Sequence, residues 1–229
     1  MKAPVFDVFF DLDHTLWDFE KNSALTFEKI LHKNNIQVDY AKFIEQYVPI
    51  NYKYWELFRE DKISNEQLRY GRLHETFGLM DVSVSEDMLT ILSEEYIKFL
   101  PENNHLFDGT LELLEYLKPK YNLHIITNGF HEVQNHKIKN SNLASYFKTI
   151  TNSESAGVKK PNPIIFEYAL HQANAKKEHS IMIGDCINAD VLGALNFGMD
   201  AILFSEIPQI FEDKKIKQIN HLLELKNYL

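Results

Sequence analysis

Residues 8–16 read VFFDLDHTL, an apolar run that ends in two carboxylates one residue apart and then a hydroxyl. The run predicts a buried strand, and because strand residues alternate between faces, Asp11 and Asp13 would lie on the same side at its carboxyl end. Two neighbouring carboxylates repel each other unless a cation or a shared proton relieves them. The segment is therefore typical of a divalent-metal and phosphoryl-transfer site. It is equally typical of a strand end whose Asp and Thr side chains cap the next helix, and only the rest of the chain separates the two.

Composition limits the classes of protein to which this chain can belong. With 229 residues, 45% of them hydrophobic and 25% charged, it can bury a substantial core as one domain with an insertion. Its single cysteine, Cys186, excludes an intramolecular disulfide and favours a reducing compartment. We find no signal-peptide pattern after Met1 and no apolar run of membrane-spanning length, and we therefore expect a cytoplasmic protein.

The net charge of −9 restricts the partners that the chain could bind. It argues against nonspecific binding to nucleic acid or to an anionic membrane, because both need a basic surface. It does not argue against a small anionic substrate, since a metal ion and one or two lysines can reverse the field inside a single cleft. Nothing in the sequence indicates an oligomeric state.

Residues 17–102 carry apolar side chains at helical spacing and contain no convincing strand. A capping-box pattern, Ser64 with Gln67, opens one of the predicted helices, and Pro101 closes the last. We expect four helices in this block, the second of them interrupted near Pro49: around residues 24–31, 43–58, 64–77 and 85–99.

From residue 103 onward, predicted strands alternate with predicted helices. The strands are expected at residues 121–127, 147–151, 180–185 and 201–204, and the helices at 108–118, 131–140, 161–173, 188–197 and 216–225. Such alternation requires a parallel sheet covered by helices on both faces. We therefore predict an α/β fold with a Rossmann-like parallel sheet core, formed by residues 1–16 and 103–229, and an inserted all-helical domain at residues 17–102.

Three of the predicted strands end in polar residues that suit phosphoryl transfer. The first ends at Asp11 and Asp13, the second at residues 127–129 (Thr-Asn-Gly), and the third at Asp185, with Asp190 one helical turn further on. Parallel strands place all their carboxyl ends at one edge of the sheet, so these groups can converge. Lys160 precedes a proline at a predicted helix start, where an ammonium and free backbone N–H groups can hold an anion. This combination makes the helix-capping interpretation of the first segment improbable.

These residues, in this order and at this spacing, resemble the four motifs of the haloacid dehalogenase (HAD) superfamily. The resemblance covers essentially the whole chain, and residues 17–102 look like the helical cap of the first type in that superfamily. It implies that Asp11 is the nucleophile that forms an aspartyl-phosphate. Asp13 would protonate the leaving alcohol and later activate water. Mg²⁺ would bind Asp11, the backbone carbonyl of Asp13, and Asp185.

The resemblance also implies roles for the remaining motif residues. Thr127 and the backbone after it, at Asn128, would bind phosphoryl oxygens, and Lys160 would neutralise charge in the transition state. Asp190 would orient Lys160 or a metal-bound water. Many relatives have Gly after the second Asp, whereas this chain has His14, which we interpret as a packing residue or one that faces the cap.

Substrate choice is expected to lie in the cap, because the core chemistry touches only the phosphate. Tyr54 and Trp55, followed by Gly71 and Arg72, resemble the pyrimidine 5′-nucleotidase branch of the superfamily, as do ITNGF at residues 126–130 and KPN at 160–162. The resemblance implies hydrolysis of pyrimidine nucleoside monophosphates such as UMP, dUMP or dTMP. Aromatic residues at helical spacing could equally form the core of the cap.

Two alternatives stay open on the sequence alone. A phosphoglycolate or sugar-phosphate phosphatase would share every core motif and differ only in the cap. A phosphoaspartate-type signalling module would also take phosphate on an Asp after a strand, but it must keep that phosphate, whereas Asp13 should speed its loss. The predicted helix at residues 131–140 resembles a zinc-protease helix, but His131 and His136 are five residues apart and diverge around it, so we interpret it as a solvated face.

Overall fold

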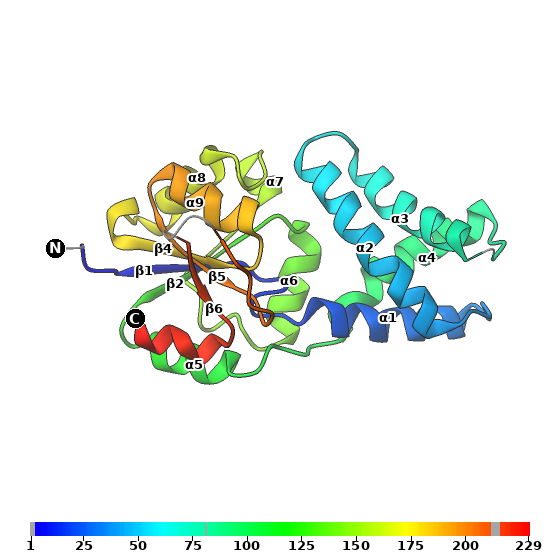
Figure 1. Ribbon diagram of the computed structural model, residues 1–229, viewed down its shortest axis with the longest axis horizontal. Coiled ribbons are helices and arrows are strands. Elements are labelled where there is room, and N and C mark those ends of the chain that lie inside the picture. Colours follow the sequence, from blue (N-terminus) through cyan, green and yellow to red (C-terminus); the bar gives the residue numbers. More distant parts are fainter. Residues whose placement is uncertain (1–2, 81, 212–215) are drawn as a thin grey trace. The chain divides into compact units, whose positions relative to one another are not determined.

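The computed structural model describes residues 3–80, 82–211 and 216–229, and its chain divides into two compact units (Figure 1). The sheet unit comprises Met1–Phe19 and Asn104–Leu229, and the helical unit comprises Glu20–Asn103. The boundaries expected from the sequence lie close by, at residues 16/17 and 102/103. None of the described helices is long and apolar enough to cross a membrane.

The described part of the sheet unit is built on six parallel strands in the order β3-β2-β1-β4-β5-β6. This is the order of a doubly wound Rossmann sheet, so the predicted fold class is confirmed. The strands are β1 (Asp7–Phe10), β2 (Asn122–Thr127), β3 (Thr149–Asn152), β4 (Ser180–Gly184), β5 (Asp200–Phe204) and β6 (Lys217–Ile219).

Helices cover both faces of this sheet. In Figure 1, α8 and α9 lie on one face and α5 lies on the other. The helices of the unit are α5 (Thr110–Leu117), α6 (His131–Asn140), α7 (Ser153–Ala156), α8 (Pro163–Ala173) and α9 (Gly193–Phe197), with a π-helical turn at Ile187–Leu192 and 3₁₀ turns at Lys177–His179 and Leu222–Asn227.

The central strands are apolar on both faces because helices pack on each side. All four residues of β1 are buried, as are all five of β4. On one face, Phe9, Ile126 and Met182 from three neighbouring strands pack against Ile165 and Phe166 of α8, and all five side chains are inaccessible to solvent. This core fixes the carboxyl ends of β1, β2 and β4 side by side, where the site is built.

The predicted closing helix at residues 216–225 is wrong. Lys217–Ile219 instead pairs with β5 as a parallel edge strand, and Leu222–Asn227 forms a 3₁₀ helix. Ile219, Leu222 and Leu225 are all buried. A spacing of three residues is typical of an α-helical stripe, but it also fits a strand end followed by a 3₁₀ turn, in which residues three apart align.

The helical unit contains four α-helices in its described part: α1 (Phe19–Lys33, whose first residue belongs to the sheet unit), α2 (Tyr40–Arg59), α3 (Asn65–Leu79) and α4 (Glu86–Phe99), followed by a 3₁₀ turn at Leu100–Glu102. The predicted capping box is confirmed: Ser64 Oγ accepts from Gln67 N at 3.1 Å, and Gln67 Oε1 accepts from Ser64 N at 2.8 Å. Aromatic rings of Phe27, Tyr47 and Tyr96 form the core of the helical unit. The centroid of the Phe27 ring lies 4.4 Å from that of Tyr47 and 4.6 Å from that of Tyr96.

The predicted interruption near Pro49 is also wrong, because α2 runs through it without a break. Pro49 lies on the exposed side of α2, while Phe43, Tyr47 and Ile50 are buried on the other side. The carbonyl that loses its helical partner belongs to Glu45, which is itself exposed, and the packing of the buried side outweighs the missing hydrogen bond.

Candidate active site

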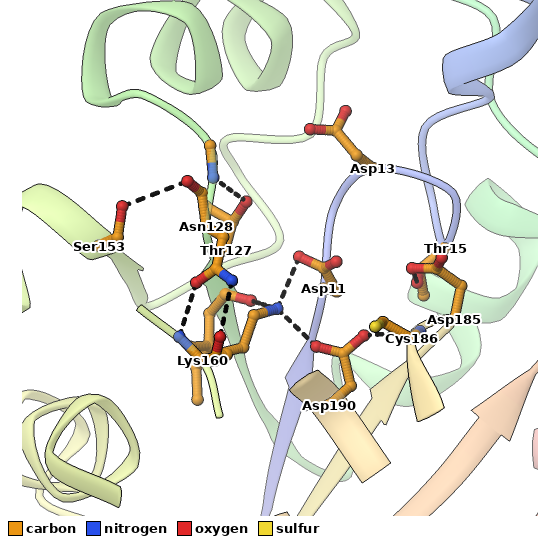
Figure 2. Close-up of polar contacts among 12 residues, drawn as sticks. Asp11, Asp13, Thr15, Thr127, Asn128, Ser153, Lys160, Asp185, Cys186 and Asp190 are labelled. Carbon is orange, nitrogen blue, oxygen red and sulfur yellow. Dashed lines mark hydrogen bonds and ion pairs between the residues drawn. The ribbon is translucent and has the colours of Figure 1, made fainter. Parts of the chain in front are cut away.

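A buried lysine joins two of the predicted acids, Asp11 after β1 and Asp190 in the π-helical turn after β4. Lys160 Nζ lies 2.9 Å from Asp11 Oδ1 and 2.7 Å from Asp190 Oδ1, and it donates a hydrogen bond of 2.7 Å to the carbonyl of Ile126 (Figure 2). The side chains of Lys160 and Asp190 are 1% and 0% exposed, whereas that of Asp11 is 14% exposed. Asp11 is thus the member of this trio that a ligand can reach.

Asp185 completes a group of three acids. One carboxylate oxygen from each of Asp11, Asp185 and Asp190 lies within 4.8 Å of the others. Thr15 Oγ1 donates to Asp185 Oδ1 at 3.4 Å, and Asp190 Oδ2 accepts from the backbone N–H of Cys186 at 3.0 Å. Asp190 is therefore engaged through both oxygens, which leaves Asp11 and Asp185 as the better placed metal ligands.

Burial and mutual repulsion raise the pKa values of two of these acids. Burial raises the pKa of Asp11 well above its usual range; Lys160 opposes this effect, and the neighbouring carboxylates add to it. Burial, reinforced by Asp190, raises the pKa of Asp185 to about 8. Burial lowers the pKa of Lys160, but Asp11 and Asp190 outweigh it and raise that pKa, so the lysine stays charged. Carboxylate oxygens are the ligands that Mg²⁺ prefers, so the group fits a divalent cation in both chemistry and charge.

The loop after β2 carries Thr127 and Asn128. Thr127 Oγ1 accepts hydrogen bonds from Gly129 N at 3.1 Å and from Gln134 Nε2 at 2.7 Å, so its own O–H is directed elsewhere. The Asn128 side chain accepts from Lys160 N at 2.7 Å and donates to Lys160 O at 3.0 Å. The amide of Asn128 thus holds the backbone of Lys160, and any contact with a phosphate would have to come from its main chain.

Asp13 is held by two residues that sequence reasoning missed. Lys137 Nζ lies 2.7 Å from Asp13 Oδ1, and Gln134 Nε2 donates to Asp13 Oδ2 at 3.0 Å. Both residues belong to α6 and are buried. The interpretation of this helix as a solvated face is correct for His131 and His136, which are exposed, but wrong for its other side. The polar composition of α6 gave no indication that one of its faces is buried. The only sequence feature that could have indicated it was the three-residue spacing of Gln134 and Lys137 beside Val133 and Ile138, which are buried.

His14 lies in the left-handed region of the backbone, with φ of 59°. Residues with a Cβ adopt this conformation at a cost and glycine does not, so glycine would be less strained at this position. The ring of His14 lies 4.8 Å from that of Phe19, centroid to centroid, in accord with local packing, the first of the two roles that we expected.

The three predicted substrate-selecting residues lie in the helical unit. Arg72 is 4% exposed, donates to Asn51 Oδ1 at 2.8 Å and lies over the ring of Tyr96 at 4.9 Å. Tyr54 packs on Gly71, where a Cβ would come within 2.4 Å of its ring. A side chain at position 71 would therefore displace the ring of Tyr54. Trp55 is partly buried and packs edge-on against Phe58, with centroids 5.7 Å apart.

Comparison with protein families gives a match to the haloacid dehalogenase-like hydrolases over residues 8–204. The chain is a haloacid dehalogenase-like hydrolase. The crystal structure of the HAD-hydrolase YfnB from Bacillus subtilis, bound to magnesium, superimposes on this HAD-like hydrolase with a TM-score of 0.89 at 28% identity, covering 99% of each chain.

Relatives of this HAD-like hydrolase include proteins that are named for different substrates. Pyrimidine 5′-nucleotidase PynA of Streptococcus pneumoniae (strain ATCC BAA-255 / R6) is 31% identical over 86% of this chain and 82% of its own length. Glyceraldehyde 3-phosphate phosphatase of Methanothermobacter thermautotrophicus is 33% identical over 90% of this chain and 88% of its own length. The names of the two relatives specify different substrates, a pyrimidine nucleotide and glyceraldehyde 3-phosphate.

Proposed function

We propose that this protein is a Mg²⁺-dependent phosphomonoester hydrolase that acts through an aspartyl-phosphate on Asp11. The observation that carries the proposal is the buried ammonium of Lys160, which lies between Asp11 and Asp190 beside Asp185. The carboxylates of Asp11, Asp185 and Asp190 gather here, that of Asp13 follows two residues after Asp11, and among the described residues the ammonium groups of Lys160 and Lys137 oppose these four charges. A phosphate-binding site needs more positive charge than this, and a divalent cation would supply it.

The first step transfers the phosphoryl group to the protein. A carboxylate oxygen of Asp11 attacks phosphorus, the bond from phosphorus to the ester oxygen breaks, and Asp13 gives that oxygen its proton. When bound to Asp11, Asp185 and the carbonyl of Asp13, Mg²⁺ supplies the positive charge that lets Asp11 ionise next to an anionic phosphate. Lys160 holds its charge throughout, and the hydroxyl of Thr127 can donate to a phosphoryl oxygen.

The second step returns Asp11 to its free state. Asp13, now a carboxylate, takes a proton from water, and the oxygen of that water attacks phosphorus as the bond to Asp11 breaks. Asp190 keeps Lys160 in place through both steps, since it meets the lysine inside the protein and is itself inaccessible to solvent.

For the substrate, we propose pyrimidine nucleoside monophosphates such as UMP, dUMP and dTMP, with the helical unit acting as the cap that selects the leaving group. The resemblance of Tyr54, Trp55 and Arg72 to the pyrimidine 5′-nucleotidase branch and the similarity to PynA support this proposal. The comparable similarity to glyceraldehyde 3-phosphate phosphatase makes a small sugar phosphate the second candidate.

Steady-state rates on a panel of phosphomonoesters separate these candidates. The panel contains UMP, dUMP, dTMP, AMP, glyceraldehyde 3-phosphate and phosphoglycolate, each with Mg²⁺ and with EDTA, and the Asp11→Asn variant serves as the blank. We expect kcat/KM for the pyrimidine nucleotides to exceed that for the other substrates by at least about tenfold, or ~1.4 kcal/mol of transition-state stabilisation. Preference for glyceraldehyde 3-phosphate would favour the second candidate, and activity that persists in Asp11→Asn would contradict the mechanism.

A further inference from the structure

The carboxylate of Asp13 is held at both oxygens by one face of α6. Lys137 meets Oδ1 at 2.7 Å and Gln134 meets Oδ2 at 3.0 Å. Asp13 keeps 20% of its side chain exposed, whereas Lys137 is 2% and Gln134 0% exposed. A carboxylate bound through one oxygen can turn about its last torsion, but turning this one would break both contacts.

The surroundings fix Lys137 and Gln134 in turn. Lys137 Nζ lies 4.3 Å from the centroid of the Trp17 ring, so its charge is held by an aromatic face as well as by Asp13. Gln134 packs over Gly129, where a Cβ would come within 2.4 Å of Gln134 Cδ. The third residue of the Thr-Asn-Gly turn is therefore glycine because the amide of Gln134 occupies the space of a side chain.

The side-chain amide oxygen of Gln134 also accepts no hydrogen bond from the described residues. Its Nε2 donates both to Asp13 and to Thr127 Oγ1, the latter at 2.7 Å, while its buried Oε1 finds no hydrogen-bond partner among the described residues. A buried amide oxygen without a donor is costly, and such exceptions call for an explanation. The arrangement directs both N–H groups of one amide at the two side chains that are proposed to act on the leaving group and on the phosphate.

We propose that Lys137 and Gln134 are positioning residues that fix the Asp13 carboxylate for proton transfer, an inference that rests on the proposed role of Asp13. Proton transfer requires the acid to lie within hydrogen-bond distance of the leaving oxygen, and a displacement of ~1 Å can cost about 100-fold in rate. Gln134 couples this orientation to Thr127, so the acid and the phosphate-binding hydroxyl are set together.

The leaving group provides a test that a merely structural role would not pass. A nucleoside leaves as an alkoxide and needs the proton of Asp13, whereas p-nitrophenolate leaves without help. We therefore expect Lys137→Met and Gln134→Met to lower kcat/KM for UMP by roughly 10- to 100-fold and kcat/KM for p-nitrophenyl phosphate by much less. The parameter kcat/KM is used because it reports the first transfer and not the later hydrolysis. Lys139→Met removes the same charge from an exposed position of α6 and should change neither value.

A double-mutant cycle then identifies the residue through which Lys137 acts. In the Asp13→Asn background, Lys137→Met should cost less than about twofold further, because the group that it positions is already gone. Thermal unfolding of each variant confirms that it is folded, and Gln134→Met provides the same test if Lys137→Met is not. Equal losses on both substrates, a full further loss in Asp13→Asn, or faster turnover of UMP in Lys137→Met would overturn the inference. If the wild-type protein hydrolysed no phosphomonoester, or if Asp13→Asn were fully active, the proposed function would be wrong and this inference would fall with it.

Discussion

Asp190 and Lys160 form an ion pair of 2.7 Å in which both side chains are inaccessible to solvent. Taking two charges out of water is expensive, and only close geometry with further hydrogen bonds repays the cost. Here the further contacts are those of Lys160 with Asp11 and the Ile126 carbonyl, and that of Asp190 with the N–H of Cys186. The pair thus connects the loop before α8 to the turn after β4, and it holds the ammonium next to Asp11, the acid of this trio that a ligand can reach.

Replacing Asp190 should therefore affect stability and catalysis together. In Asp190→Asn, Lys160 loses one of its two carboxylates inside the protein, and we expect the free energy of unfolding to fall by about 3–5 kcal/mol. Turnover should fall as well, because the ammonium is no longer fixed beside Asp11. Urea unfolding and steady-state rates measure the two effects. Asp108→Asn is the control: its side chain is 97% exposed in a pair with His221, so its loss should cost no more than about 1 kcal/mol. A stable and fully active Asp190→Asn protein would contradict this role.

Gly184 should be intolerant of any side chain. A Cβ at this position would come within 2.3 Å of Asp190 Oδ2, so Gly184→Ala must displace the carboxylate that holds Lys160. We expect the rate to fall about 100-fold, as for a displacement of ~1 Å at a catalytic group. Gly78→Ala in α3 is the matched control, since a Cβ there would meet no atom of the described residues within 4 Å, and the exchange should stabilise the helix by about 0.5–1 kcal/mol. Unaltered activity in Gly184→Ala would show that the position of Asp190 is not critical.

The raised pKa values of Asp11 and Asp185 predict how stability depends on pH without metal. In the unfolded chain both acids lose their protons near pH 4, whereas in the folded protein Asp185 keeps its proton up to about pH 8. Between these values the folded state binds more protons, so stability should fall as the pH rises toward 8. With EDTA we expect the Tm to drop by a few degrees (~2–4 °C per kcal/mol) between pH 6.5 and 8.

Addition of Mg²⁺ should reverse this loss. Binding requires the acids to be deprotonated, so the gain in Tm from Mg²⁺ should be larger at pH 8 than at pH 6.5. Thermal unfolding with EDTA and with saturating Mg²⁺ at both pH values measures the difference, and Asp185→Asn should abolish most of it. An equal Mg²⁺ effect at both pH values would mean that the cation does not displace protons from these acids.

Substitution of Arg72 tests whether this residue only stabilises the core of the helical unit or also selects the substrate. Arg72→Met removes the 2.8 Å hydrogen bond to Asn51 Oδ1 and leaves that oxygen with only the longer one from the Tyr47 hydroxyl, at 3.4 Å, which should lower the free energy of unfolding by about 1–3 kcal/mol. Lys62→Met, at a side chain that is 61% exposed, is the control and should have little effect. If Arg72 also selects the leaving group, the ratio of kcat/KM for UMP to that for glyceraldehyde 3-phosphate should fall by about tenfold at a temperature where the variant is folded. An unchanged ratio would restrict Arg72 to the core.

The sequence predicted most of the sheet, and the convergence of Asp11, Asp185 and Asp190 at its edge, because both depend on strong local patterns. The apolar runs before Asp11, Thr127 and Asp185 had to be buried strands, and parallel strands bring their carboxyl ends together. Segments whose sequence is compatible with two different secondary structures were harder to predict. Pro49 does not interrupt α2, because the helical hydrogen bond that proline cannot donate is lost on the exposed side of the helix. Lys217–Ile219 forms a strand because the free edge of β5 is available for pairing.

Contacts of Lys137 and Gln134 with Asp13 could not be read from the sequence. A helix rich in Gln, Asn, His and Lys is normally a solvated one, and no spacing rule links residue 13 to residues 134 and 137. Their burial depends on the tertiary placement of α6 against the segment after β1, where the carboxylate of Asp13 and the ring of Trp17 meet the ammonium.

The most direct test of the proposed mechanism is to find where the phosphoryl group goes. Asp13→Asn should slow the hydrolysis of the intermediate more than its formation from p-nitrophenyl phosphate, so the phosphorylated protein should accumulate in the presence of Mg²⁺. Acid quenching followed by peptide mass spectrometry should then locate one phosphoryl group on Asp11, and none in Asp11→Asn. Turnover by the wild-type protein with no phosphoryl group on Asp11 in Asp13→Asn, or with the group on another residue, would contradict the proposed mechanism.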